Sequence, residues 1–333
     1  MKYAIGIDGG GTKTLGILAD QDGRVLASAS VGGTNHQICG ASTAGQRLAD
    51  LTFALLKAAG VSTREIGFLC MGLAGADRRE DVCLLERHLP EFLREIPHGI
   101  WNDVWIAFAA GTVSEWGAVS VSGTGHNAAV RTPDGQTFGI NALKFPLGNA
   151  GGGRMLTDWA LHMAFRAWEH TGPETLLTRE LPRACGQKDS AGIFENVYNS
   201  QYTAQYDWPV PRLVDDLACR GDPVCRELLG KLGAVQGEIL AGLMHHAGLT
   251  EGKVPVVLAG SIYQKTASPV LFDAFYEKIR GVCPDAQFTV AQRPPCTGAV
   301  LMALKQMVPS AGDDLRLSWL PMLEKTLKEK EVV

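Results

Sequence analysis

The sequence predicts an α/β protein with two domains and a duplicated core. Its 333 residues are enough for two domains of ordinary size. A strand, a glycine-rich turn and a second strand are indicated over residues 4–20, and the same order returns over residues 117–130. Because the two hairpins lie about 115 residues apart, they imply that one structural unit occurs twice.

The composition is typical of a globular protein and argues against several kinds of partner. Hydrophobic residues make up 46%, charged residues make up 20%, and the formal net charge is −4. Without a basic run, nucleic acid and anionic membranes are not expected as partners. No apolar run reaches the roughly 18 residues that span a bilayer, and no signal-peptide pattern precedes the first strand. We therefore expect a cytoplasmic protein.

The cysteines indicate neither a zinc site nor a disulfide framework. There are eight of them, scattered along the chain, and none forms a C-x-x-C pair. The histidines do not cluster with them. Reduced thiols are consistent with the expected compartment.

The first hairpin is predicted to bind phosphate groups. Neither common phosphate loop fits, because both need a helix after the glycines and a strand follows here. Glycines let a ligand approach the backbone N–H groups closely, and the turn adds two hydroxyls and an ammonium group. The residues expected to contact a polyphosphate are Gly9, Gly10, Gly11, Thr12, Lys13 and Thr14. Asp8 lies beside them, where a carboxylate suits the water shell of a divalent cation. An ordinary glycine-rich hairpin turn is the alternative.

A second group of polar residues precedes the helix predicted over residues 41–59. Asn35 and His36 lie in the loop between a strand and this helix. Open α/β sheets bind ligands at such carboxyl ends of strands. The alternative is a structural role, since Asn is common in loops for its hydrogen bonds to the backbone.

Asp103 is the candidate general base. It follows a short strand predicted over residues 99–102 and opens a helix over residues 104–110. Phosphorylation of an alcohol needs a carboxylate within hydrogen-bond reach of the attacking hydroxyl. The alternative is that Asp103 only caps the helix, where a carboxylate also suits the helix dipole.

The second half of the chain repeats these features. The turn of the second hairpin contains Gly123, Thr124 and Gly125. A glycine-rich segment over residues 148–153 precedes another helix, and a buried strand over residues 253–258 is followed by Gly260 and Ser261. Aromatic residues between positions 198 and 208 are assigned to core packing or a dimer surface, with a carbohydrate platform as the alternative.

The motifs together resemble the BadF/BadG/BcrA/BcrD ATPase family, which includes N-acetylglucosamine kinases. They are D-G-G-G-T-K-T, T-N-H, N-D-x-x-x-A-x-x-A-G, S-G-T-G-x-N and A-G-S, in that order, and they span nearly the whole chain. The resemblance implies two ribonuclease-H-like (actin-like ATPase) domains with a nucleotide cleft between them. It also implies transfer of the ATP γ-phosphate, with Mg²⁺, to a hydroxyl of an amino-sugar substrate, N-acetylglucosamine and its 6-phosphate above all.

The resemblance also assigns roles to individual residues. It makes Asp103 the base and Asp8 an outer-shell ligand of Mg²⁺. Thr124 would bond a phosphate oxygen, and Gly260 and Ser261 would lie against the adenosine. The residues that it implies for the sugar are Asn35, His36, Asn127 and Asn149.

Two short segments depart from the family pattern. Ala142-Leu143 stands where the family has Gly-Trp, and Asn149-Ala150 stands where it has an acidic pair. These family positions contact the sugar. Asn149 can still hydrogen-bond a hydroxyl but carries no charge. The departures therefore bear on the identity of the substrate more than on ATP binding.

The domain limits and two alternative functions complete the expectations. The first domain is expected over residues 1–115, joined by the tail at about 310–333, and the second over residues 116–309, with a helical insertion at about 171–248. In the other branch of the family, activators of 2-hydroxyacyl-CoA dehydratase or benzoyl-CoA reductase systems hold an iron–sulfur cluster on cysteines, and no suitable pair stands out here. That role and a non-catalytic nucleotide-dependent sensor are the alternatives. The sequence leaves the formation of a homodimer open.

Overall fold

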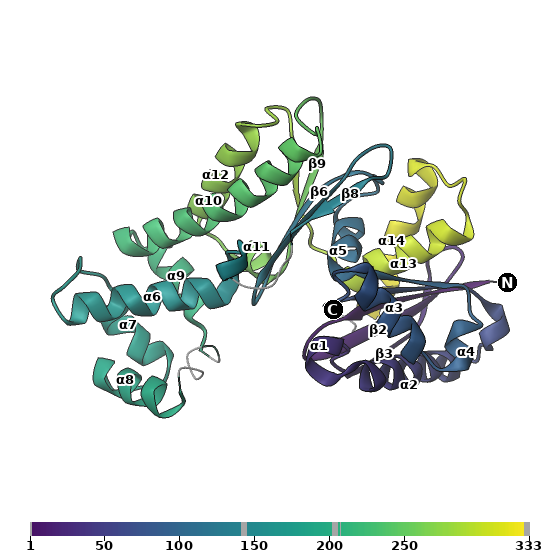
Figure 1. Ribbon diagram of the computed structural model, residues 1–333, viewed down its shortest axis with the longest axis horizontal. Coiled ribbons are helices and arrows are strands. Elements are labelled where there is room, and N and C mark those ends of the chain that lie inside the picture. The colour runs from purple at the N-terminus through teal and green to yellow at the C-terminus, as the bar shows by residue number, and fades with distance from the viewer. Residues whose placement is uncertain (1, 141–144, 202–205, 207, 330–333) are drawn as a thin grey trace. The chain divides into compact units, whose positions relative to one another are not determined.

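The structure is a computed structural model that describes residues 2–140, 145–201, 206 and 208–329. It divides into two compact units (Figure 1). The first unit comprises Met1–Glu115 and Ala291–Val333, and the second comprises Trp116–Val290. Among the described residues, none of the helices has the length and apolar character needed to cross a membrane.

The first unit is built on a five-stranded sheet in the order β3-β2-β1-β4-β5. Its strands are β1 (Tyr3–Gly9), β2 (Lys13–Asp20), β3 (Val25–Gly32), β4 (Ile66–Leu73) and β5 (His98–Asn102). The first three are antiparallel, whereas β4 and β5 run parallel to β1. The carboxyl ends of β1, β4 and β5 therefore meet at one edge of the sheet.

Helices cover both faces of this sheet. They are α1 (His36–Cys39), α2 (Ala41–Ala59), α3 (Arg79–His88), α4 (Glu91–Arg94), α5 (Asp103–Gly111), α13 (Pro295–Met307) and α14 (Asp313–Glu329), with a 3₁₀ turn at Thr63–Glu65. Ile5 and Ile7 pack with Leu48, Leu51 and Leu55 of α2 on one face. Residues of α13 and α14 form a separate core on the other face. Because side chains alternate along a strand, β1 is buried on both sides.

The position of α13 corrects the domain boundary expected at residue 309. This helix packs against β1, β4 and α5 of the first unit. The contact between β1 and α13 is so close that it requires glycine at position 6, because a Cβ there would lie 2.4 Å from the backbone nitrogen of Val300. The chain thus returns to the first unit at Ala291, before α13 and not after it.

The second unit repeats the topology of the first with the order β10-β9-β6-β7-β8. Its strands are β6 (Gly117–Ser122), β7 (His126–Arg131), β8 (Thr137–Gly139), β9 (Pro255–Ala259) and β10 (Gln287–Val290). An antiparallel run of three strands again begins with the predicted hairpin, and β9 and β10 continue the sheet in parallel. The predicted duplication is confirmed by this shared strand order.

The helices of the second unit include the predicted insertion. They are α6 (Gly152–Trp168), α7 (Leu177–Ala184), α8 (Ser190–Asn199), α9 (Val210–Cys219), α10 (Pro223–His246), α11 (Ser261–Lys265) and α12 (Pro269–Arg280), with a 3₁₀ turn at Phe145–Leu147. The long helix α10 begins as the sequence predicts, because the Asp222 carboxylate accepts a hydrogen bond from the Cys225 N–H at 2.8 Å. It packs against α12, α9 and the sheet.

Candidate active site

The turn of the first hairpin is hydrogen-bonded to the loop that follows β3. Gly33 donates its N–H to the Thr12 carbonyl at 2.9 Å, and Thr34 donates to the Gly10 carbonyl at 3.0 Å. A Cβ at Gly33 would lie 2.1 Å from the Gly11 carbonyl oxygen, so only glycine allows this approach. Gly11, Thr12 and Lys13 remain exposed at the tip. Their backbone and side-chain donors can meet a phosphate there.

Other predicted members of this turn are less accessible. Gly9 is buried, and Gly10 is half-buried and donates its N–H to the Lys13 carbonyl. Thr14 is fully buried, with its hydroxyl 3.0 Å from the hydroxyl of Thr34. The hydroxyl of Thr14 therefore joins the turn to the neighbouring loop.

Two carboxylates lie at the common edge where β1, β4 and β5 end. Asp8 is near the end of β1, and Asp103 follows β5 as the first residue of α5. Burial raises the pKa of Asp8 to about 6. Burial raises the pKa of Asp103 to about 7, and the carboxylates of Asp8 and Asp77 add to the effect. A carboxyl with a pKa near 7 is suited to take a proton at neutral pH.

The cap of helix α5 is Asn102 and not Asp103. The side-chain oxygen of Asn102 accepts a hydrogen bond from the Val104 N–H at 3.0 Å. Asp103 lies in the first turn of α5, where its carboxylate also suits the helix dipole, so the structural alternative is not excluded. The role of Asp103 as general base stays a prediction.

Asp77 is a member of the site that the sequence analysis missed. It lies in the loop after β4, where Asn102 Nδ2 donates to its Oδ1 at 2.8 Å and Gln37 Nε2 donates to its Oδ2 at 3.3 Å. The available signal was an acidic residue after a strand next to the one that carries Asp103.

Asn35 lies in the same group of loops. Its side-chain oxygen accepts a hydrogen bond from the Gln37 N–H at 2.9 Å and caps the short helix α1. It also lies against Gly75, where a Cβ would be 2.7 Å from the Asn35 oxygen. The structural role considered for Asn35 is therefore present, and its amide nitrogen remains the group to offer a ligand.

His36 is more enclosed than the sequence suggests. Its side chain is 7% exposed, and Nε2 lies 3.5 Å from Asp81 Oδ1. Asp81 is also bound by Arg78 at 3.0 Å. The ring is therefore buried against Asp81 of α3. Its role toward substrate stays a prediction.

In the second unit, the turn of the hairpin is bound to the start of helix α6. Gly153 donates its N–H to the Gly123 carbonyl at 2.8 Å, and Arg154 donates to the Thr124 carbonyl at 3.1 Å. Gly152, with φ of +83°, would place a Cβ 2.5 Å from the backbone of Gly125. Two N–H groups that a helix start leaves unpaired thereby fix the turn.

The segment after β9 approaches the same hairpin. Gly260 has φ of +95°, and a Cβ there would lie 2.4 Å from the Ser122 carbonyl oxygen. Glycine is therefore needed at this position. Ser261 is exposed and begins helix α11.

These predicted residues line a cavity of about 650 Å³ in the second unit. Gly123, Thr124 and Ser261 form part of its wall, together with Tyr206 and Trp208. The two aromatic residues had been assigned to packing or a dimer surface, and the structure places both at this cavity. The guanidinium of Arg154 lies 5.0 Å from the centre of the Tyr206 ring, and the Tyr206 hydroxyl donates to Asp158 at 3.2 Å.

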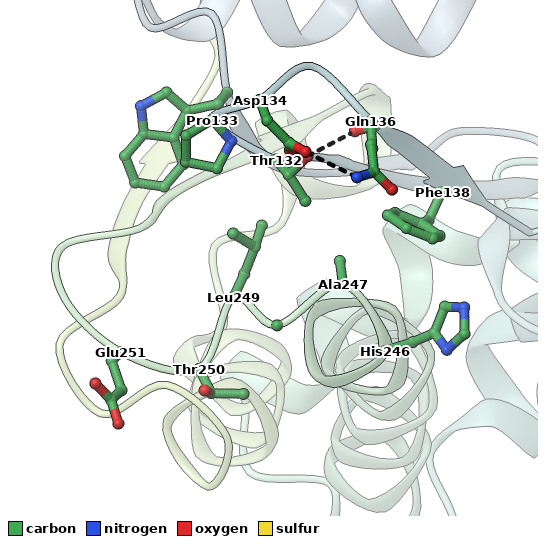
Figure 2. Close-up of a pocket in the computed structure, with 12 residues that line it drawn as sticks. Thr132, Pro133, Asp134, Gln136, Phe138, His246, Ala247, Leu249, Thr250 and Glu251 are labelled. Atoms are coloured by element: carbon green, nitrogen blue, oxygen red, sulfur yellow. Dashed lines mark hydrogen bonds between the residues drawn. The ribbon is translucent and has the colours of Figure 1, made fainter.

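A second cavity, of about 670 Å³, contains none of the predicted site residues. Figure 2 shows it between the turn that begins at Thr132, strand β8 with Phe138, and the end of α10 at His246. Of its two carboxylates, Asp134 and Glu251, the first already accepts hydrogen bonds from Thr132 and Gln136. We assign it no role.

Two further predicted sugar residues lie close to the hairpin turn of the second unit. Asn127 is on β7, opposite Val121. Asn149 donates its Nδ2 to the His126 backbone carbonyl at 2.9 Å. Ala142-Leu143, the other departure from the family pattern, lies outside the described residues.

Comparison with family profiles shows to which protein family the chain belongs. The profile of the BadF/BadG/BcrA/BcrD ATPase family matches residues 5–303. The chain belongs to this family. The matched part contains both hairpin turns, Asp103 and the segment at Gly260.

Proteins with assigned activities also align along nearly the whole chain. N-acetylmuramic acid/N-acetylglucosamine kinase of Clostridium acetobutylicum is 25% identical over 307 residues, 91% of this chain and 98% of that protein. N-acetyl-D-glucosamine kinase of Dictyostelium discoideum is 26% identical over 311 residues, 90% of this chain and 97% of that protein. A crystal structure of a candidate N-acetylglucosamine kinase from Chromobacterium violaceum has a TM-score of 0.68 at 23% identity, with coverage of 91% and 99%. This likeness confirms the predicted fold class.

Proposed function

We propose that this protein is an ATP-dependent kinase of an amino sugar. N-acetylglucosamine is the substrate that we favour, with its 6-hydroxyl as acceptor, because two relatives that align over at least 90% of the chain carry that sugar in their names. A third relative, which aligns over 80% of the chain, is named a glucosamine kinase. We also propose that the protein acts in the cytoplasm, where ATP is available as the phosphate donor.

The observation that carries the proposal is the environment of Asp103. The residue stands at the carboxyl ends of parallel strands, where α/β proteins bind ligands, and the cap of its helix is supplied by Asn102. Its pKa of about 7 lets the carboxylate accept a proton from a sugar hydroxyl at neutral pH. Loss of that proton makes the oxygen a better nucleophile toward the γ-phosphate of ATP.

The hairpin turns supply the groups that a nucleotide needs. In the first unit, the exposed donors of Gly11, Thr12 and Lys13 suit phosphate oxygens. The nearby carboxylate of Asp8 suits a water ligand of Mg²⁺, which would neutralise charge on the phosphates when bound. In the second unit, the cavity at Thr124 and Ser261 suits the adenosine.

The aromatic wall of that cavity refines the nucleotide site. Tyr206 and Trp208 both line the cavity, and the bicyclic indole of Trp208 matches a purine in size. The guanidinium of Arg154 already lies over the Tyr206 ring. Stacking of the base on an aromatic side chain would add binding energy that does not depend on the sugar.

The direct test is ADP release with Mg·ATP against a panel of sugars. The panel contains N-acetylglucosamine, glucosamine, glucose, N-acetylmannosamine and N-acetylmuramic acid, with a blank that lacks sugar. We expect release that depends on an N-acetylated sugar, and mass spectrometry of the product should show one added phosphate. Release at the same rate in the blank and with every sugar would contradict a sugar kinase.

The pH profile gives an independent prediction. The value of kcat/KM should fall below about pH 7, because Asp103 then takes up a proton and loses its capacity as a base. In Asp77→Asn the fall should move to lower pH, since removal of a negative charge favours ionised Asp103. Glu80→Gln, which also removes an exposed negative charge from this region, serves as the matched control. A midpoint that stays in place or rises in Asp77→Asn would contradict this assignment.

A further inference from the structure

Two segments that lie far apart in the sequence line the cavity of about 650 Å³ in the second unit. One comprises the start of α9 and the residues just before it, and it includes Trp208, Pro211 and Asp215. The other comprises α11 and the residues that follow it, and it includes Ser261 and Ala267. The position of one segment relative to the other therefore determines which ligand the cavity fits.

Both segments also pack against the start of helix α6. A Cβ at Gly153 would lie 3.4 Å from Cγ of Pro211 and 3.7 Å from Cδ1 of Ile262, which is ordinary van der Waals contact. The N–H of Gly153 donates to the Gly123 carbonyl in the hairpin turn. The helices α9 and α11 thus meet the same residue beside the turn that is predicted to bind phosphate.

The side chain of Asp215 connects the two segments directly. Its Oδ2 accepts a hydrogen bond from the Ala267 N–H at 2.8 Å, and its Oδ1 accepts one from the Ser268 N–H at 3.0 Å. Asp215 is 5% exposed. Hydrogen bonds to a carboxylate are stronger than those between neutral groups, and two of them fix both the position and the orientation of the segment.

A purely structural role for Asp215 explains only one of these bonds. Ser268 is the N-cap residue of α12, and in a capping box its N–H would bind the side chain of the third helical residue. That residue is Leu271, which has no acceptor, so Asp215 supplies one from another helix. The bond to Ala267 lies outside α12 and holds a residue that lines the cavity.

We propose that Asp215 is a positioning residue of the nucleotide site, which holds the segment at Ala267 in a fixed place relative to α9 and so sets the width of the cavity for adenosine. The inference rests on the proposed function, in which this cavity takes the adenosine of ATP. Asp215 acts on the nucleotide through residues 266–268. Without its two bonds this segment would adopt several positions, and the ligand would have to order it on binding, at a cost in affinity.

The first test compares a ligand that contains adenosine with one that does not. For Asp215→Ala, the Kd of a non-hydrolysable ATP analogue with Mg²⁺, measured by calorimetry, should rise by about 10- to 100-fold. Inorganic tripolyphosphate with Mg²⁺ should bind the variant and the unchanged protein equally. An equal loss for both ligands would overturn the proposal, because Asp215 would then support the phosphate turn or the whole fold. So would an unchanged Kd for the ATP analogue.

Steady-state kinetics with the sugar make the same distinction. In Asp215→Ala the KM for ATP should rise by a similar factor, whereas kcat and the KM for the sugar should stay as they are. A fall in kcat with an unchanged KM for ATP would overturn the proposal, because the residue would then act on the transferred phosphate and not on the adenosine.

Two further variants separate the hydrogen bonds from charge and from stability. Asp215→Asn keeps one acceptor oxygen, so its Kd should rise less than that of Asp215→Ala, and it carries the test if the alanine variant does not fold. A rise at least as large would overturn the proposal, since the loss would follow the charge and not the bonds. Asp189→Ala is the matched control, because Asp189 caps α8 through the Gly192 N–H and does not line the cavity. It should lower Tm and leave the Kd unchanged.

Amide hydrogen exchange measures the two bonds in the protein without ligand. The amides of Ala267 and Ser268 should be protected, and their exchange should be at least about 10-fold faster in Asp215→Ala. Rapid exchange of both amides in the unchanged protein would overturn the proposal. A protein that binds the ATP analogue but phosphorylates no sugar would contradict the proposed function alone. A protein that binds no ATP analogue would overturn both.

Discussion

Asp103→Asn should lower kcat by about 100- to 10,000-fold, the range that removal of a general base produces. The amide has nearly the same size as the carboxylate but cannot take the proton of the attacking hydroxyl. Binding of an ATP analogue should remain, because the nucleotide groups lie on the hairpin turns and not on α5. Single-turnover phosphorylation and calorimetric titration measure the two effects separately. Unchanged turnover would exclude Asp103 as the base.

The same substitution should stabilise the protein at high pH. The pKa of Asp103 in the folded state, about 7, lies above its ordinary value of 3.8. The folded state therefore holds this proton more tightly than the unfolded state does, and stability falls as pH rises from about 4 to about 7. Because asparagine carries no charge, Asp103→Asn should have a higher Tm at pH 8, and the difference should vanish near pH 4. Asp22→Asn, at an exposed turn of the same unit, is the control.

Gly298→Ala should lower the free energy of unfolding by about 3 kcal/mol or more. A Cβ at this position would lie 1.9 Å from the Ile106 carbonyl oxygen and 2.6 Å from the Ala110 nitrogen. Both atoms belong to the backbone of α5, so no side-chain rotation can relieve the contact. The helices α5 and α13 would have to separate, and Asp103 begins α5. We therefore expect a loss of activity together with the loss of stability.

A glycine in an open position gives the matched control for this substitution. Gly242 lies in helix α10, and a Cβ there would meet no described atom within 4 Å. Gly242→Ala should raise stability by up to about 1 kcal/mol, since alanine favours the helix. Urea unfolding followed by tryptophan fluorescence measures both variants. A Gly298→Ala protein as stable as the unchanged one would show that α5 and α13 have room to move.

Local sequence patterns were sufficient for the two hairpins and for several helix limits. The glycine turns, the alternation of strands and helices, and the Asp222-Pro223 start of α10 are all determined by residues close together in the chain. The assignment of α13 to the second domain was wrong, because its amino-acid pattern would suit a buried helix in either unit. Its partners, β1 and β4, lie more than 200 residues earlier, and no local signal names them.

Site residues that lie within a sequence motif were predicted. Site residues that come close to the others only through the folding of the chain were missed. Asp77 follows a strand like Asp103 does, but its contact with Asn102 depends on the order of β4 and β5 in the sheet. Tyr206 and Trp208 lie in the helical insertion, far in sequence from Thr124. Their common cavity depends on the packing of α6, α9 and α11.

The interrupted course of the first unit has a consequence for synthesis on the ribosome. The second unit is one continuous segment, Trp116–Val290, whereas the first unit needs Ala291–Val333 to cover a face of its sheet. During translation the second unit can therefore finish folding while the strands of the first unit still expose Ala4, Ile17 and Ala19 to solvent. The usual order, in which the amino-terminal domain matures first, is reversed here. A nascent chain stalled near residue 290 should bind chaperones through that uncovered face.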